Sequence, residues 1–263
     1  MDTSPTPTPV VPPVQPTTSP IVPTSIKPHV EIFSLYGSMW EYFQKHWKRL
    51  VLIQAILFIP YEVVSFLPRI GGSQTLDASA AMSVGQIFTF LALTALVIIV
   101  DLFLTAWGQG ALFLALRDAS SSATQLLSLS SRIILPVTGV LLLAALATTA
   151  GAFLFLLPGI YVAIMFSVAA PVVVYEKTGG TQALRRSWGY IKGNWWRVFG
   201  SFLLGGVVIL VVLLILGALF DRLFQREAGS VITAAFSYVL ITPLSICFLS
   251  ALYERLSQKA PPV

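Results

Sequence analysis

Long stretches without a charged side chain are the feature that most constrains how this chain folds. Asp, Glu, Lys and Arg are all absent from residues 78–100, 133–175, 198–220 and 228–253. A helix needs about 20 consecutive, mostly apolar residues to cross a bilayer. Each stretch is therefore long enough for one crossing, and 133–175 is long enough for two. Only 10% of the whole chain is charged, whereas an ordinary soluble domain has about 25%. The chain is predicted to be an integral membrane protein.

These stretches, together with the apolar run that follows Arg49, predict an all-α polytopic membrane protein with six transmembrane helices. The predicted spans are at 50–68, 87–110, 133–154, 159–176, 198–220 and 231–252. Pro158 and Gly159 break the helix between the third and fourth spans and predict a tight hairpin turn there. Pro60, Pro136, Pro171 and Pro243 fall within or at the ends of spans and predict kinks, because proline lacks the backbone N–H that a helix uses.

The two ends of the chain differ in composition from the predicted membrane domain, residues 29–257. Residues 1–28 are rich in proline and threonine and predict a disordered tail, because proline fixes φ and removes backbone donors. Residues 258–263 form a short second tail. With the N-terminus in the cytoplasm, all 16 lysines and arginines except Arg69, Arg222 and Arg226 fall on the cytoplasmic side. The positive-inside rule therefore places both termini in the cytoplasm.

An aromatic and basic segment occurs twice. The sequence WEYFQKHWKRL, residues 40–50, aligns without gaps on WGYIKGNWWRV, residues 188–198. Each copy comes directly before an apolar span, which favours two three-helix repeats, 29–132 and 177–257, on either side of a 133–176 hairpin. Large apolar residues recur in each copy at steps of three and four, a spacing that predicts one continuous helix, from 36 to 50 and from 184 to 198.

Both copies are predicted to be amphipathic helices that lie in the cytoplasmic interface and turn into a span. Tryptophan favours the headgroup region, and each lysine or arginine near anionic lipid contributes about 1 kcal/mol. The candidate lipid-headgroup residues are Trp40, Trp47, Arg49, Arg185, Arg186, Trp188, Lys192, Trp195, Trp196 and Arg197. A belt that only fixes the depth of the helices would carry the same residues, so a specific site and a generic anchor both remain open.

Residues 156–199 carry a resemblance to a known family. The pieces that carry it are Pro158–Gly159, Pro171, Glu176–Lys177, Ala183–Leu184, Ser187 and Trp195–Trp196. The segment resembles the YciC-type bacterial inner-membrane proteins. It is also similar to the membrane domain fused to some glycerophosphoryl diester phosphodiesterases. The resemblance implies a six-helix protein of the bacterial cytoplasmic (inner) membrane. Its motifs are structural, and the phosphodiesterase activity of those fusions belongs to a separate soluble domain.

Two acidic residues inside predicted spans, Glu62 and Asp101, are the candidates for intramembrane chemistry, because ionisable groups are costly there. They permit a proton or cation relay. The alternative is that Glu62 lies near the outer interface and that Asp101 is protonated and hydrogen-bonded to a neighbouring helix. A catalytic site is not expected, because no Walker loop, HExxH or GxSxG motif occurs. The single cysteine, Cys247, and two histidines also predict no metal site or cofactor.

The leading prediction is a non-enzymatic, lipid-engaging or scaffolding role in the bacterial envelope. Its partners would be membrane lipids, anionic ones above all, and a membrane protein. Nucleic acid is not expected, because the basic residues lie at the ends of apolar runs rather than in one soluble patch. The alternative is a small-solute or lipid transporter that uses Glu62 and Asp101.

Overall fold

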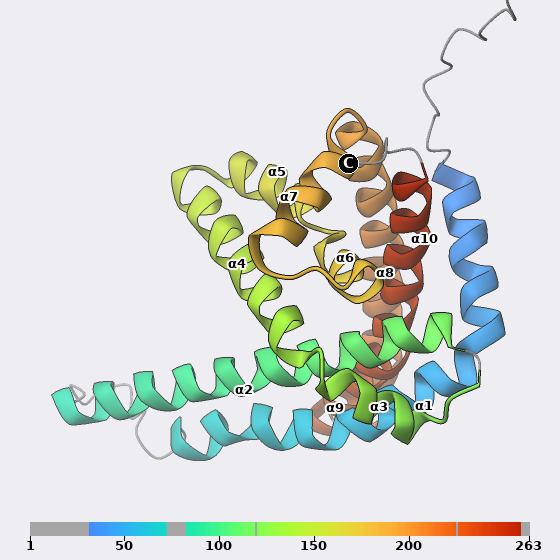
Figure 1. The fold of residues 1–263 in the computed structure, drawn as a ribbon. Coiled ribbons are helices and arrows are strands. Elements are labelled where there is room, and N and C mark those ends of the chain that lie inside the picture. The colour runs from blue at the N-terminus through green and yellow to red at the C-terminus, as the bar shows by residue number, and fades with distance from the viewer. Residues whose placement is uncertain (1–31, 73–82, 119, 225, 259–263) are drawn as a thin grey trace, which may run out of the picture.

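The chain is helical throughout the part that the computed structural model describes (Figure 1). The described residues are 32–72, 83–118, 120–224 and 226–258. Strands are absent from these ranges, so the predicted all-α class is confirmed. The predicted tail 1–28 lies outside the described residues, as does all of the tail 258–263 except its first residue.

Ten α-helices and one π-helix follow one another within the described ranges. They are α1 (Ile32–Gly72), α2 (Val84–Arg117), α3 (Ala123–Ser131), α4 (Ile134–Leu154), α5 (Leu156–Met165), α6 (Ala169–Glu176), α7 (Gly180–Ile191), α8 (Trp195–Leu223), α9 (Arg226–Phe236), η1 (Ser237–Ile241) and α10 (Thr242–Ser257). Five segments of the described chain are long and apolar enough to cross a membrane: Val84–Arg117, Ile134–Leu154, Leu156–Glu176, Trp195–Leu223 and Ile232–Ser257. They correspond to the second to sixth predicted spans. The first predicted span, 50–68, forms part of α1, and its crossing stays a prediction.

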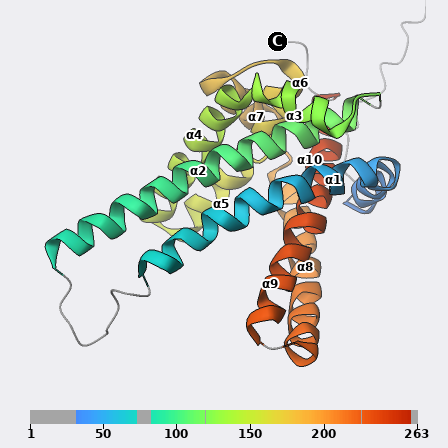
Figure 2. The ribbon, with the colours of Figure 1, turned by 90° about the horizontal axis from the view of Figure 1, so that it is seen from below.

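Within the described residues, three helical hairpins diverge from a common base. α1 pairs with α2, α4 with α5, and α8 with α9, and the far ends of these hairpins point in different directions (Figure 1, Figure 2). The opposite ends gather with α3, α6, α7 and the end of α10 on one side of the molecule (Figure 2). The buried core lies in this base and includes Leu50 of α1, Phe113 of α2, Val172 of α6 and Leu252 of α10.

Helix α1 bends sharply, so that its first part runs across the direction of the rest (Figure 1). The first part buries Leu35, His46 and Leu50 against the protein. Trp40 and Trp47 lie on another face and are each about half exposed. A helix that lies along a membrane surface and then turns into the bilayer would have this shape. The amphipathic helix predicted at 40–50 therefore fits the fold, although its place in a membrane stays a prediction.

The second copy of the repeat is not the continuous helix that was predicted over 184–198. Helix α7 ends at Ile191 and α8 begins at Trp195. Gly193 between them has φ +94, a left-handed conformation that glycine adopts readily and other residues rarely do. The aligned position in the first copy is Lys45, which lies inside α1. The prediction was wrong because the apolar spacing continues across a glycine that breaks the backbone.

The predicted hairpin between the third and fourth spans is present, but its turn is not at Pro158 and Gly159. The helices α4 and α5 meet at the single residue Phe155. Pro158 lies in the first turn of α5, where its missing N–H is not needed. The fourth span is also not one helix: it breaks at 166–168, between α5 and α6. Pro171 explains this break, because its ring clashes with the carbonyl four residues earlier in a regular helix.

Helix α3 was not predicted, although the sequence carries its start signal. Ser122 Oγ accepts a hydrogen bond from the backbone N–H of Gln125 at 3.3 Å, and Gln125 Oε1 accepts one from the N–H of Ser122 at 2.9 Å. This reciprocal pair is a capping box, which satisfies N–H groups that the first helical turn leaves unpaired. The signal was missed because α3 is short and connects two spans.

A close approach between α4 and α5 gives a test of this fold. A methyl group at Gly159 would lie 2.8 Å from Cβ of Ala152. We expect Gly159→Ala to destabilise the protein by about 1–3 kcal/mol, because the two backbones must separate. The control is Gly139→Ala in α4, where an added Cβ meets nothing within 4 Å and stability stays equal or rises. Thermal unfolding of both variants in detergent measures the difference, and equal unfolding temperatures would contradict this packing.

Candidate functional site

A single carboxylate in the base joins three helices. Helix α6 ends at Glu176, and the hydroxyls of Tyr190 and Tyr253 donate to its Oε1 at 2.8 and 2.9 Å. Arg186 forms an ion pair with Oε2 and donates a hydrogen bond to it. Because Tyr190 and Arg186 belong to α7 and Tyr253 to α10, the carboxylate holds α6, α7 and α10 together. We refer to these four residues as the Glu176 cluster.

The Glu176 cluster holds its protons firmly on its donors. Burial and the hydrogen bond to Glu176 raise the pKa of Tyr190 to about 12. The hydrogen bond to Glu176 also raises the pKa of Arg186 above its usual range. A general acid or base works best with a pKa near the working pH. The cluster is therefore suited to fastening helices rather than to transferring protons near neutral pH.

Glu254 and Arg255, which follow Tyr253 on α10, bind the first part of α1. Tyr42 donates a hydrogen bond to Glu254, and burial together with this bond raises the pKa of Tyr42 to about 12. Arg255 donates to the hydroxyl and carbonyl oxygens of Ser34, both at 2.6 Å, and to Ser38 Oγ at 2.9 Å. Charged groups form stronger hydrogen bonds than neutral ones, so α1 and α10 are firmly joined here.

A second group of contacts attaches α2 to the same region. The hydroxyls of Tyr175 and Ser250 lie 2.7 Å apart. The guanidinium of Arg117 lies over the ring of Tyr175, 4.1 Å from its centroid, which is the geometry of a cation–π contact. Through Arg117 and Tyr175, the end of α2 is joined to α6 and α10.

The predicted lipid-headgroup residues of the first copy lie on α1 in the base. Trp40 stacks on Phe43 with ring centroids 5.9 Å apart, and about half of its side chain stays exposed. Trp47 is similarly exposed and has Lys48 beside its ring. Arg49 donates a hydrogen bond to the carbonyl of Asp118 at 3.2 Å. The rings of Trp40 and Trp47 can therefore contact lipid or water around the protein, whereas Arg49 contacts the protein.

The second copy surrounds the turn between α7 and α8. Trp196 is the most exposed aromatic side chain there, at 77%. Arg185 and Lys192 are exposed, Trp188 is partly exposed and Arg197 is half-buried.

Two members of the second copy contact the protein instead of facing outward. The ring of Trp195 stacks on Tyr161 and Phe199, with centroids 5.4 and 5.1 Å apart. The charge of Arg186 is paired with Glu176. The two copies lie on either side of α10 (Figure 1), so the structure does not bring their residues into one site.

The predicted intramembrane carboxylates lie along the α1 and α2 hairpin. Asp101 is near the middle of α2, about 25 Å from either end at about 1.5 Å per residue. Tyr61 lies on α1, the helix that packs along α2. The rings of Tyr61 and Tyr238 stack with centroids 4.5 Å apart. Glu62 is half-buried and follows Tyr61 directly. Among the described residues, no group of three or more His, Cys, Asp and Glu side chains is placed to hold a metal ion.

The part of the chain that contains the Glu176 cluster is similar to a known protein family. Residues 137–256 match the family model for the membrane domain of glycerophosphoryl diester phosphodiesterase. The predicted resemblance to that membrane domain is thus confirmed over this stretch, which runs from α4 to α10 and contains the whole Glu176 cluster. No curated protein and no solved structure matches the chain. Together, the match and the five apolar segments of the described chain show a multi-pass membrane protein.

Sequence reasoning did not identify the Glu176 cluster as a unit. Glu176 was noted only as part of the family resemblance, and Arg186 only as a candidate for lipid binding. Tyr253 lies far along the chain from both. The one local signal was a carboxylate at the end of a long apolar stretch, where burial requires a partner. Which partner it finds depends on how the helices pack.

The Glu176 cluster gives a second test. We expect Tyr253→Phe to lower the free energy of unfolding by about 1.5–3 kcal/mol, the range for a hydrogen bond to a charged group. The control is Tyr161→Phe, because the Tyr161 hydroxyl makes no hydrogen bond within the described residues. That variant should unfold like the wild type. Denaturant unfolding in detergent, followed by tryptophan fluorescence, compares the two, and equal loss in both variants would contradict the role of the cluster.

Proposed function

We propose that the chain is a six-span protein of the bacterial cytoplasmic membrane with both termini in the cytoplasm. The sixth crossing would be the second part of α1, which pairs with α2 along the hairpin. Support for the orientation comes from the arrangement of basic residues. Lys48, Arg117 and Arg185 belong to the base, whereas Arg222 lies near the far end of α8. If the base faces the cytoplasm, the positive-inside rule is satisfied.

We further propose a non-enzymatic function, the binding of anionic phospholipid at the cytoplasmic surface. The observation that carries the proposal is the contrast among the cations around the α7–α8 turn. Arg186 is paired with Glu176. Among the described residues, Arg185, Lys192 and Arg197 make no ion pair, and the exposed rings of Trp188 and Trp196 lie beside them in the chain. Unpaired cations next to interfacial tryptophans favour an anionic headgroup.

The lipid-binding proposal predicts the effect of neutralising these three cations. We expect Arg185→Gln, Lys192→Gln and Arg197→Gln together to lower the preference for phosphatidylglycerol over phosphatidylcholine about 100-fold, at about 1 kcal/mol per charge. Quenching of the protein's tryptophan fluorescence by brominated lipids in mixed bilayers measures the relative association constant. Arg222→Gln, at the far end of α8, is the control and should leave the preference unchanged. An unchanged preference in the triple variant would reject the proposal and leave this surface as a depth anchor.

A second candidate function, proton or cation transport, is favoured by the surroundings of Asp101. Tyr238, which stacks on Tyr61 of α1, belongs to the π-helix η1. Single π-helical turns occur frequently at functional sites, and an intramembrane carboxylate is a functional candidate in its own right. Both features therefore lie on elements that pack against α1 in the predicted membrane.

The transport candidate is tested by removing the Asp101 charge. We expect Asp101→Asn to abolish proton entry into proteoliposomes loaded with a pH-sensitive dye and driven by a potassium diffusion potential. Glu41→Gln removes a carboxylate from an exposed position of α1 and should leave the flux at the wild-type level. Wild-type flux no greater than that of protein-free liposomes, or equal flux in Asp101→Asn, would reject transport through Asp101.

A further inference from the structure

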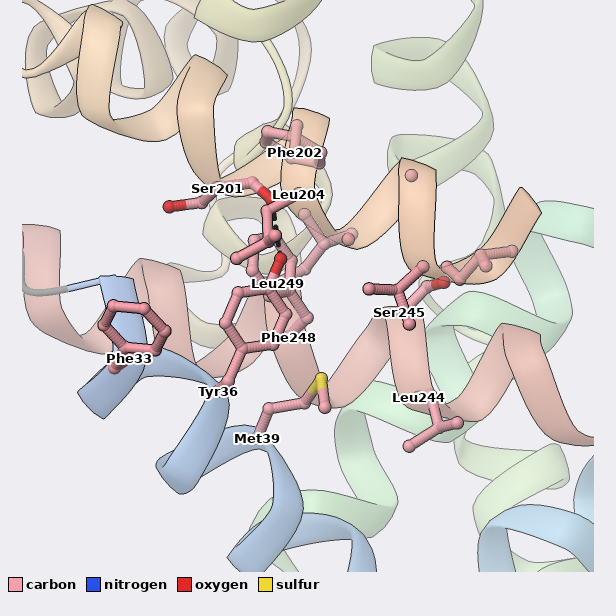
Figure 3. Close-up of a pocket in the computed structure, with 14 residues that line it drawn as sticks. Phe33, Tyr36, Met39, Ser201, Phe202, Leu204, Leu244, Ser245, Phe248 and Leu249 are labelled. Carbon is pink, nitrogen blue, oxygen red and sulfur yellow. Dashed lines mark hydrogen bonds between the residues drawn. The ribbon is translucent and has the colours of Figure 1, made fainter. Parts of the chain in front are cut away.

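A groove of about 530 Å³ runs between the first part of α1, the first half of α8 and the first half of α10. Its size lies within the range of about 300–1,000 Å³ that is typical of small-molecule sites. Figure 3 shows Tyr36 and Met39 projecting from α1 toward Phe248 and Leu249 of α10. The rings of Tyr36 and Phe248 have centroids 5.6 Å apart. The groove is therefore formed by helices from both ends of the chain.

Every hydroxyl group that lines the groove already has a partner in the protein. Tyr36 donates to the carbonyl of Ser201 at 2.6 Å (Figure 3). The Ser201 hydroxyl donates to the carbonyl of Arg197 at 2.9 Å, and the Ser245 hydroxyl to that of Ile241 at 3.0 Å. All other lining residues are apolar or glycine. An occupant of this groove would therefore meet a mostly apolar lining whose hydroxyl protons are already used within the protein.

The α1 wall of the groove is fixed in place at several points. Arg255 binds Ser34 and Ser38, one residue away from the lining residues Phe33 and Met39. Tyr36 itself is held by its bond to the α8 backbone. An added Cβ at Gly205 would lie 2.7 Å from the Tyr36 hydroxyl, so this glycine allows the contact. The α1 wall of the groove is thus held in position by hydrogen bonds to both α8 and α10.

The groove opens toward the predicted hydrocarbon of the bilayer. Its lining residues Phe33, Leu204 and Val208 are 85%, 40% and 55% exposed. Two of its walls, α8 and α10, belong to candidate membrane spans. Inside a bilayer, the medium that meets such an opening consists of lipid chains. The surroundings therefore indicate that hydrocarbon fills the groove.

Arg197 comes one turn before the first lining residue of α8 and is on the same side of this helix. Residues four apart in a helix share a face, so Arg197 stands one turn, about 6 Å, before the lining residue Ser201. From Ser201 the lining continues along α8 through Gly205 to Ile209, over about 12 Å at about 1.5 Å per residue. A lipid whose headgroup anion binds Arg197 would have its acyl chain at the end of the groove nearest to Ser201.

We propose that the groove holds one acyl chain of a single anionic phospholipid whose phosphate binds Arg197. This inference rests on the proposed lipid-binding function and turns a surface preference into a discrete site. An acyl chain gains little by leaving the bilayer for an apolar groove, because the lipid phase is equally apolar. Tight retention therefore needs both parts together: the charge at Arg197 selects the headgroup, and packing in the groove orders one chain beneath it.

Filling the groove without disturbing its walls provides the test. Gly206 lines the groove, and an added Cβ there meets nothing within 4 Å, so Gly206→Leu should occupy the space without a clash. Gly217→Leu makes the same change on α8, also with nothing within 4 Å of the Cβ, but outside the groove. The phosphatidylglycerol molecules that each purified variant retains are counted by native mass spectrometry. The relative association constant from brominated lipids is measured alongside.

We expect the wild type and Gly217→Leu to retain one phosphatidylglycerol molecule. In Gly206→Leu the retained amount should fall about tenfold, whereas the preference for phosphatidylglycerol over phosphatidylcholine in mixed bilayers should stay unchanged. Retention in Gly206→Leu equal to that of the wild type would overturn the groove site. Absence of a retained lipid from the wild type, together with an intact preference for phosphatidylglycerol, would overturn the groove site alone. A wild type that neither retains a lipid nor prefers phosphatidylglycerol over phosphatidylcholine would overturn the proposed function. Retention in the wild type of phosphatidylcholine at the level of phosphatidylglycerol would overturn the role of Arg197.

Discussion

Three consecutive side chains near the end of α10, Tyr253, Glu254 and Arg255, hold the base of the molecule together. Tyr253 binds the carboxylate of Glu176, which in turn binds α7. Glu254 accepts a hydrogen bond from Tyr42, and Arg255 binds serines of the same α1 segment. One turn of α10 is thus fastened to α6 and α7 on one side and to α1 on the other. Both copies of the aromatic segment, and the groove between α1 and α8, depend on this turn for their relative positions.

The hairpins need no comparable fastening away from the base. The most apolar window of α8 has 0% of its residues buried within the protein, whereas that of Leu156–Glu176 has 56%. In water, such an exposed arm would collapse onto other apolar surface. In a bilayer the lipid is as apolar as the side chains, so burial between helices brings no hydrophobic gain. The polar base can therefore determine the arrangement of helices while lipid covers the diverging arms, and an open groove between two of them is compatible with a stable fold.

Much of the fold could be predicted from the sequence, because charge-free length is a direct physical requirement for crossing a bilayer. Local breaks were predicted less well. Apolar spacing continues across Gly193, where only the backbone shows the interruption, and the turn before α5 is at Phe155 rather than at Pro158. Little of the site could be predicted. Arg185 and Arg186 are adjacent and chemically alike, yet only Arg186 lies within reach of Glu176. Which of two equivalent cations is paired depends on helix packing, which leaves no trace in the local sequence.

We propose that the base faces the cytoplasm and that the hairpin tips face the opposite side of the membrane. Cysteine labelling tests it directly, because the chain has one cysteine, Cys247, which is fully buried. Lys192→Cys reports on the base, and Val84→Cys, at the start of α2, reports on the far side. A membrane-impermeant maleimide should label Lys192→Cys only in inverted membrane vesicles and Val84→Cys only in intact spheroplasts. Labelling of both positions from the same side, or of Lys192→Cys in spheroplasts, would contradict this orientation.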